Sequence, residues 1–323
     1  MEHKGLVAFG GVWPNSHQEN FEAECDRILA STALEFGISG FKGEAESEFT
    51  RIVGMSTAGT KGEDYVKAIN EIDPELFDYI DKFRENDKCG DPILKDFGEV
   101  EATVSGSITY KTLIEASRDE SGNPVLKDFS KLGKISANTL RYVMTLAFLR
   151  KHFSTKLDNM TFVEIGGGYG GLCKVISCVV DFKSYTLIDL PSVVRLQRKY
   201  LEILGFDKDD PDTPVRVVHF YDSENIDVDK EYDICISEYC ISEFDIPGQE
   251  FYIDNVIGKS KNAYLLINFH HSGGYNHPDV TTPFMDKLKN YFDIVELIED
   301  PEFPLIDKVK DGKYIICKDN KNL

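Results

Sequence analysis

A glycine-rich stretch, FVEIGGGYGGL at residues 162–172, has the residue types and spacing of a nucleotide-binding turn. Gly166, Gly168 and Gly171 match the GxGxxG pattern of dinucleotide enzymes, whereas Gly166, Gly168 and Gly170 match the GxGxG pattern of enzymes that bind S-adenosylmethionine (SAM). Glycine lets the backbone approach a ligand closely and point a helix N-terminus at its anionic group, which suits a pyrophosphate and the SAM carboxylate alike. The glycines alone therefore predict a nucleotide-like ligand without selecting one.

Two carboxylates beside the glycines favour SAM over a dinucleotide. Glu164 precedes Gly166 by two residues, where dinucleotide folds usually place an apolar residue and methyltransferases an acidic one. A carboxylate there must be hydrogen-bonded, so we expect it to order the loop or to meet the methionine amino group through water. Asp189 ends the next predicted strand, where it can hold ribose hydroxyls of either ligand. The fingerprint also begins in mid-chain, whereas dehydrogenases more often open with it.

Other candidate contacts follow the predicted strands, because ligands of open α/β sheets bind at the carboxyl ends of the strands. Leu190 could cover one face of an adenine, while Tyr221 and Asp222 could meet its edge and its amino group. Ser237 and Glu238 end the fourth predicted strand, below the expected sulfonium. Each of these residues could instead contact no ligand and simply begin the loop that follows its strand.

If the ligand is SAM and its methyl group goes to an alcohol, a group must take the hydroxyl proton, and the candidates follow strands four and five. The fifth predicted strand ends in NFHHSGGYNHPD, which brings His270 and His271 to the carboxyl edge of the sheet. Histidine can accept a proton near neutral pH, and we favour His271 as the base. Glu238 is the rival base, and we interpret Glu243 as structural.

A divalent metal is the alternative to a base, since a metal can acidify a hydroxyl. His271, His277 and Asp279 could hold magnesium together with the substrate. This mixture of ligands suits no hard cation especially well, so we do not favour metal dependence.

The elements that must position these residues follow from hydrophobic periodicity. From about residue 160 onward, strand-like runs alternate with helical ones, which is typical of βαβ units and of an α/β fold. The last two strands are separated by DPEFPLIDKVKDG, which leaves no room for a helical crossover, so they should be antiparallel. Such a sheet resembles that of class I SAM-dependent methyltransferases, with strand order 3-2-1-4-5-7-6. The predicted strands are 161–165, 185–189, 215–220, 232–237, 263–269, 294–298 and 313–317, with helices between the first five, for example at 171–180, 192–204 and 249–257.

The first 135 residues show helical periodicity instead, at 20–35 and 63–86. We therefore predict a mainly helical N-terminal domain (1–135), which could supply a lid, an acceptor pocket or a dimer face, and a SAM-binding domain (136–323). The segment GDPILKDF at 90–97 recurs as GNPVLKDF at 122–129, but two copies do not make a repeat protein.

Composition limits the classes of partner. Asp and Glu total 56 against 36 Lys and Arg, and the resulting net charge of −20 repels phosphate backbones, so we expect no nucleic-acid partner. The seven cysteines contain no CxxC pair and suggest neither a disulfide framework nor a zinc ribbon. No window approaches the roughly 18 apolar residues of a membrane span, and we expect a cytoplasmic protein that binds no membrane.

Four segments of the chain resemble the sugar O-methyltransferase family. In sequence order they are GKISANTLRYVMTLAFLRKHF (133–153), FVEIGGGYGGLCKVI (162–176), SYTLIDLPSVVRLQRKYL (184–201) and YDICISEYCISEF (232–244). The combination of EIGGGYGG with a following IDLP is much more specific than GxGxG. The resemblance implies SAM as cofactor and methyl transfer to a hydroxyl of a sugar, nucleotide-linked or part of a surface glycan.

The resemblance extends to one further residue and shows two departures. Arg141 lies in the matching TLRY segment and could pair with the SAM carboxylate, or could be a surface or domain-bridging arginine. Ala137 stands where the family usually has proline, and Glu238 where it often has a neutral asparagine, which adds charge near the reacting centre. The alternatives left open are methylation of a non-sugar small molecule or a protein, a silent SAM-fold module that binds a partner, and an oxidoreductase. A homodimer is also compatible with the sequence.

Overall fold

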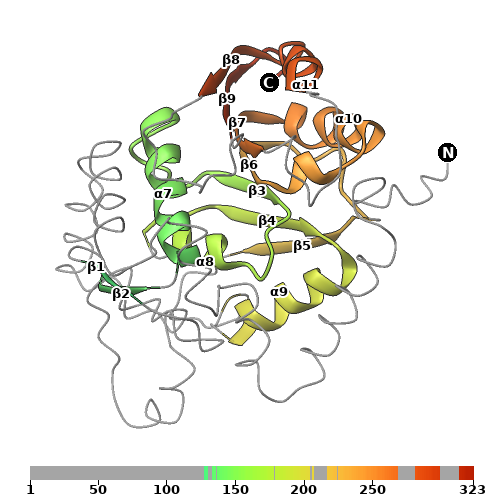
Figure 1. The fold of residues 1–323 in the computed structure, drawn as a ribbon. Helices are drawn as coiled ribbons and strands as arrows, with labels where there is room; N and C mark the ends of the chain where they lie inside the picture. The colour runs from blue at the N-terminus through green and yellow to red at the C-terminus, as the bar shows by residue number, and fades with distance from the viewer. Residues whose placement is uncertain are drawn as a thin grey trace, which may run out of the picture.

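The computed structural model describes residues 127–129, 133–135, 137–177, 179–203, 206, 217–223, 225–267, 281–298 and 313–323. A short antiparallel pair, β1 (Lys127–Phe129) and β2 (Gly133–Ile135), precedes a larger mixed sheet with its helices (Figure 1). The helices predicted at 20–35 and 63–86 lie outside the described residues. The second copy of the repeated segment ends in β1, and the domain boundary at 135 stays a prediction.

The larger sheet has seven strands in the order β5-β4-β3-β6-β7-β9-β8. Within it, β9 runs antiparallel to both neighbours, whereas β5, β4, β3, β6 and β7 pair in parallel. In sequence order this is 3-2-1-4-5-7-6, so the predicted sheet and its antiparallel ending are confirmed. The strands are β3 (Thr161–Ile165), β4 (Ser184–Asp189), β5 (Val218–Asp222), β6 (Tyr232–Glu238), β7 (Ser260–Ile267), β8 (Phe292–Ile298) and β9 (Lys313–Asn320).

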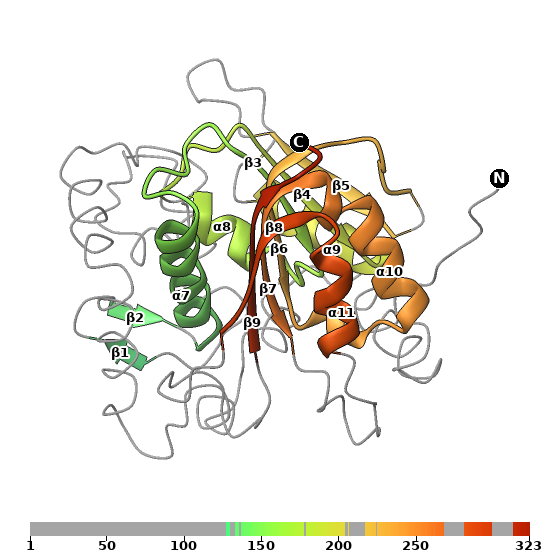
Figure 2. The same ribbon diagram turned by 90° about the horizontal axis from the view of Figure 1, so that it is seen from above.

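Helices cover both faces of this sheet. Figure 2 shows α7 and α8 on one side of the sheet and α10 and α11 on the other. On the α7 side, the ring of Phe148 lies 5.9 Å from that of Tyr264 and 4.9 Å from that of Tyr314. None of the described helices is both long and apolar enough to cross a bilayer. The helices are α7 (Ala137–His152), α8 (Gly171–Ser177), α9 (Pro191–Ile203), which runs along β4 and β5, α10 (Ile246–Asn255) and α11 (Thr281–Leu288).

One predicted helix is wrong. The described residues between β5 and β6, 223 and 225–231, contain turns and irregular backbone but no helix. The polar side chains of this segment bond locally instead: Asn225 Nδ2 donates to Asp222 Oδ1 at 2.8 Å, and Asp229 N donates to Asp227 Oδ1 at 3.2 Å. Asn and Asp side chains that bond to nearby groups compete with helical hydrogen bonding, which explains the turn.

Helix α10 begins earlier than the predicted start at residue 249. Asp245 caps the helix, because its Oδ1 accepts a hydrogen bond from Gly248 N at 2.8 Å. Pro247 lies in the first turn, where its missing N–H costs nothing. Cap chemistry therefore sets this boundary, which the hydrophobic pattern placed too late.

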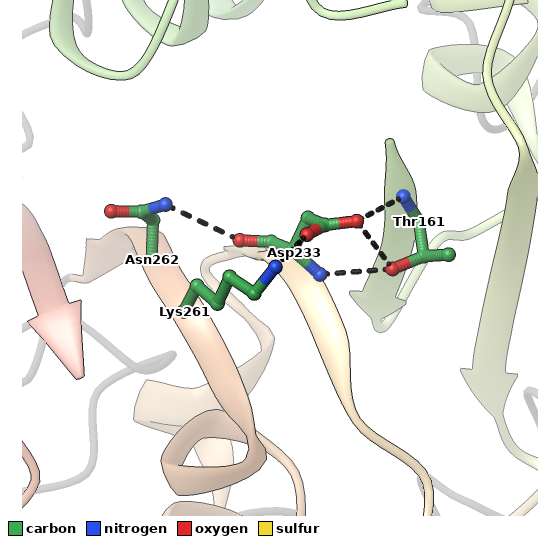
Figure 3. A network of polar contacts seen from close by, with 4 residues as sticks. All are labelled: Thr161, Asp233, Lys261 and Asn262. Atoms are coloured by element: carbon green, nitrogen blue, oxygen red, sulfur yellow. Dashed lines mark hydrogen bonds and ion pairs between the residues drawn. The ribbon is translucent and has the colours of Figure 1, made fainter. Parts of the chain in front are cut away.

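Asp233 ties three strands together at the amino edge of the sheet (Figure 3). Its Oδ2 accepts hydrogen bonds from Thr161 N at 2.8 Å and Thr161 Oγ1 at 2.9 Å, while Lys261 Nζ lies 2.8 Å from its Oδ1. Burial tends to raise the pKa of Asp233, but the bonds from Lys261 and Thr161 outweigh it and hold the pKa below its usual value. This cluster fixes β3, β6 and β7 at the edge opposite the glycine loop.

Candidate functional site

The glycine loop connects β3 to α8 at the carboxyl edge of the parallel strands. Gly166, Gly168 and Gly170 have φ values of 77°, 55° and 92°, a left-handed backbone that favours glycine. Gly166 N donates to Ile188 O at 2.8 Å and fastens the loop to the end of β4. A Cβ on Gly166 would lie 2.3 Å from Cys240 Cβ and 2.4 Å from its Sγ. The first glycine of the motif is thus required by both conformation and space.

Asp189 holds the loop from the end of β4. Its Oδ2 accepts hydrogen bonds from Gly168 N and Gln197 Nε2, both at 3.1 Å, and its Oδ1 accepts one from Leu190 N at 2.8 Å. The side chain is only 8% exposed, and this burial raises the pKa of Asp189 to about 7 in spite of the three hydrogen bonds. A carboxylate has about four acceptor positions, so one position has no donor among the described residues and could accept a hydroxyl.

Two residues of α9 that follow Asp189 closely in the sequence each have a buried polar side-chain atom. Neither Gln197 Oε1 nor Ser192 Oγ has a hydrogen-bond partner among the described residues, although both residues are fully buried. Buried polar atoms without a protein partner usually bind ordered water or a ligand group. The neighbourhood of Asp189 thus has spare hydrogen-bonding capacity, as a site for a hydroxyl-bearing ligand requires.

Glu164 supports the glycine loop from within the sheet. It is 4% exposed and accepts a hydrogen bond from Tyr185 OH at 2.8 Å. A Cβ on Gly167 would lie 3.2 Å from the Glu164 carboxylate and 2.6 Å from Leu187 Cδ2, so the backbone passes directly over this group. This position suits the first of the two predicted roles, ordering the loop.

The end of β6 places its last two side chains differently. Ser237 is fully buried; its Oγ donates to Ile165 O at 3.3 Å and accepts from Ile241 N at 3.3 Å, so it joins two neighbouring segments of backbone. Glu238 is half-buried and accepts a hydrogen bond from Thr145 Oγ1 of α7. Of the two, Glu238 is therefore the one that a substrate could reach.

A short 3-10 helix, η4 (Cys240–Glu243), follows β6. Tyr239 turns the chain into it with a left-handed φ of 64°, and Tyr239 N donates to Leu266 O of β7 at 2.7 Å. Burial and the nearby carboxylates, with Asp189 first among them, raise the pKa of the Cys240 thiol well above its usual value. Burial, followed by the charge of Asp189, raises the pKa of Glu243 to about 7. Segment η4 therefore brings a thiol and a carboxyl group to the glycine loop.

Helix α7 contacts both parts of this edge. The Tyr142 ring lies 6.4 Å from that of Tyr169 in the glycine loop, and Tyr169 meets Tyr200 of α9 edge-on at 5.1 Å. One turn further along α7, Thr145 bonds Glu238. The helix thus links the chain before the sheet to the loop and to the end of β6.

The remaining predicted residues fall into two groups. Tyr221 is half-buried with Lys230 Nζ 5.8 Å from its ring centroid, Asp222 accepts from Asn225, and Leu190 is 1% exposed in the core. The other group lies outside the described part of the chain: the side chain of Arg141, whose backbone belongs to α7, and the whole of His270, His271, His277 and Asp279.

No metal cluster is present in the part of the chain that the structure describes. Among those residues, no three His, Cys, Asp or Glu side chains are grouped to hold an ion. The predicted set of His271, His277 and Asp279 lies outside them and stays untested.

The sheet order and the placement of the glycine loop at its carboxyl edge decide the fold. The chain has the class I methyltransferase fold. No protein-family profile and no curated protein sequence matches it. Solved structures resemble it at the level of fold. They include an O-methyltransferase family protein from Burkholderia thailandensis (14% identity over 50% of this chain and 51% of that chain, TM-score 0.34). Another is small RNA methyltransferase HEN1 (13% identity over 56% of this chain and 25% of that chain, TM-score 0.43). A third is PigF with SAH (12% identity over 56% of this chain and 60% of that chain, TM-score 0.36).

Three residues of this methyltransferase-fold site were not foreseen from the sequence: Thr145, Gln197 and Cys240. Gln197 and Thr145 lie inside helices, and each acts through a partner on a strand that is distant along the chain. Cys240 lies three residues beyond the predicted end of the fourth strand, and nothing in the local pattern distinguishes it from a core cysteine. Only the strand-end carboxylates carried a signal that could have led to them.

Proposed function

We propose that the chain is a SAM-dependent methyltransferase. The supporting observation is that a left-handed glycine loop and a buried Asp189, with one acceptor position that no described residue uses, meet at the carboxyl edge of a class I methyltransferase sheet. In this proposal the loop backbone, ordered by Glu164, lies against the cofactor, and Asp189 accepts a hydrogen bond from a ribose hydroxyl. SAM supplies an activated methyl group, and the remaining chemistry falls to residues of the chain.

We further propose that the acceptor is a hydroxyl of a sugar, nucleotide-linked or part of a glycan. The support is the four-segment resemblance, together with a half-buried carboxylate, Glu238, at the end of β6 next to the loop. Such a group can accept the hydrogen bond of a hydroxyl and then its proton. His271 is the other proposed base, and His270 its neighbour. The N-terminal domain (1–135) would complete the acceptor pocket and could carry a homodimer face.

Thermal unfolding with ligands tests the cofactor. SAM and S-adenosylhomocysteine (SAH) should each raise the melting temperature, because a ligand that binds only the folded state stabilises it by about 2.7 kcal/mol at one hundred times its Kd. Asp189→Ala should remove most of that gain. A rise with NAD alone would contradict the proposal in favour of an oxidoreductase, and no response to any of the three would favour a silent partner-binding module.

Acceptor profiling tests the sugar. With SAM carrying a labelled methyl group, nucleotide sugars or glycan precursors should be labelled while proteins and non-sugar alcohols are not. Labelling confined to a protein or to a non-sugar metabolite would remove the sugar from the proposal and leave the methyltransferase.

A further inference from the structure

A second carboxylate faces the glycine loop from η4. Cys240 is the first residue of this 3-10 helix and Glu243 the last. In a 3-10 helix, side chains three residues apart lie one above the other on the same face. Cys240 lies against Gly166, and the charge of Glu243 acts on Cys240 while the charge of Asp189 acts on Glu243. Glu243 therefore lies near Asp189 and the residue that packs on the first glycine of the loop.

Glu243 has no structural partner in the described part of the chain. Its carboxylate forms no hydrogen bond or ion pair with any described residue, although the side chain is half-buried. Among the described residues, the titratable groups whose charges act on Glu243, or on Cys240 and Tyr252 beside it, are Asp189 of β4, Glu164 of β3 and these residues themselves, and none of them is a cation. An acid held in such surroundings without a partner is costly, and no described residue offsets that cost.

The Asp189 carboxylate likewise has no positively charged partner among the described residues. The three described groups that donate to it are neutral: the backbone amides of Gly168 and Leu190 and the side-chain amide of Gln197. Two carboxyl groups thus border the loop with no positive side chain bonded to either of them among the described residues. A positively charged ligand would supply what the site lacks.

We propose that Glu243 receives a positive charge of the ligand held in the glycine loop, while Asp189 keeps its role toward the ribose hydroxyl. This inference rests on the proposed function, in which the ligand is SAM. SAM carries two such charges, the ammonium of its methionine part and the sulfonium at the reacting centre. Glu243 is then a ligand-binding residue that favours the charged cofactor over neutral adenosine derivatives.

Calorimetric titration of the full chain with a charge series tests the inference. The ligands are SAM (ammonium and sulfonium), SAH (ammonium only) and 5′-methylthioadenosine (neither). Glu243→Gln keeps the size of the side chain and should weaken SAM binding about ten- to a hundredfold, the cost of one charged hydrogen bond. Binding of 5′-methylthioadenosine should not change. The matched control is Glu250→Gln, the same substitution at an exposed position of α10, which should leave all three affinities unchanged.

The three ligands also separate the two sources of charge. If Glu243→Gln weakens the binding of both SAM and SAH, Glu243 contacts the ammonium. If it weakens the binding of SAM alone, Glu243 contacts the sulfonium. Either result supports the inference. Equal weakening of 5′-methylthioadenosine, or no change for any ligand, overturns it while the proposed function stands. If the unsubstituted chain binds none of the three ligands, the proposed function itself fails.

The number of protons released when SAM binds would not depend on Glu243 if this residue had only a structural role. At pH 6 a cation arriving next to Glu243 should expel its proton, so SAM binding should release protons, measured from the dependence of the binding enthalpy on the buffer. Glu243→Gln should reduce this release, whereas Glu250→Gln should not. Equal release in all three proteins contradicts the assignment.

Discussion

Cys240 lies directly against Gly166, so that any side chain at residue 166 would overlap it. The same glycine has a φ of 77°, which side-chain-bearing residues rarely adopt. Two independent restrictions thus act on the first position of the glycine motif. One of them, the contact with Cys240, comes from a segment more than seventy residues further along the chain.

Gly166→Ala should therefore damage both folding and ligand binding. The left-handed backbone costs about 1–2 kcal/mol for alanine, and forcing a methyl group into the packed contact costs about 1–3 kcal/mol more. We expect urea unfolding to show a total loss of about 2–5 kcal/mol and titration to show no SAH binding. Cys240→Gly in the same chain removes the overlap and should recover the steric part only. A double-mutant cycle without such coupling would show that the two residues do not meet.

Glu238→Gln and His271→Ala separate the two proposed bases. We expect His271→Ala to lower kcat by about 10²–10⁴-fold while SAM affinity stays nearly unchanged, because a base acts in the transition state. Full activity of this variant would remove His271 from the mechanism. If Glu238→Gln is the inactive variant instead, the base is the carboxylate.

Thr145→Val provides a control for that second outcome. Valine preserves the shape of threonine but removes the hydroxyl that donates to Glu238. If Glu238 takes the proton, this variant should lower kcat, because the hydroxyl that holds the carboxylate is gone. If His271 takes the proton, kcat should stay nearly as it is.

The sheet could be predicted because its signals are local. Alternation of strand-like and helical runs gives the parallel strands, and the short segment before the last strand requires an antiparallel ending. The helix expected between β5 and β6 was wrong because Asn225 and Asp227 bond within their own turn, which competes with helix formation. Local pattern thus predicts elements well and predicts a polar connection less well.

The site was predictable only in part, for a similar reason. The glycines and Asp189 stand at strand ends, and the rule that ligands bind at the carboxyl edge brings them together from the sequence. Gln197 and Cys240 act through contacts that depend on the final packing of a helix and a turn. Glu243 was interpreted as structural, and it is the absence of a partner among the described residues that now suggests another role.

Asp233→Asn should destabilise the sheet without affecting the site. The change removes the charge that holds Lys261 and weakens the bonds to Thr161, and we expect a loss of about 1–3 kcal/mol in urea unfolding. The pKa of Asp233 is lowered in the folded state, so its contribution is present above the unfolded pKa of about 3.9 and is lost as the pH falls below it. Asp229→Asn, at an exposed position, should show neither effect. SAH affinity that fell in Asp233→Asn would contradict this separation of the two edges.

The ligand-free protein should lose stability as the pH rises from about 4 to about 7 because of Asp189 and Glu243. Burial raises the pKa of each to about 7 in the folded state, whereas the unfolded values are about 3.9 and 4.3. In this window the folded state binds more protons than the unfolded state, so the free energy of unfolding decreases with rising pH and the contribution is gone above pH 7.

Urea unfolding at pH 5 and pH 8 of the unsubstituted chain and of Asp189→Asn/Glu243→Gln measures this contribution. The double variant cannot gain charge at these positions, so its loss between the two pH values should be smaller by about 2–4 kcal/mol. Repulsion from the net charge of −20 acts on both proteins and cancels in the difference. Saturating SAM should reduce the pH-dependent loss in the unsubstituted chain, because a bound cation favours the ionised carboxylates. Identical pH profiles for the two ligand-free proteins would show that neither carboxyl group is perturbed by its burial.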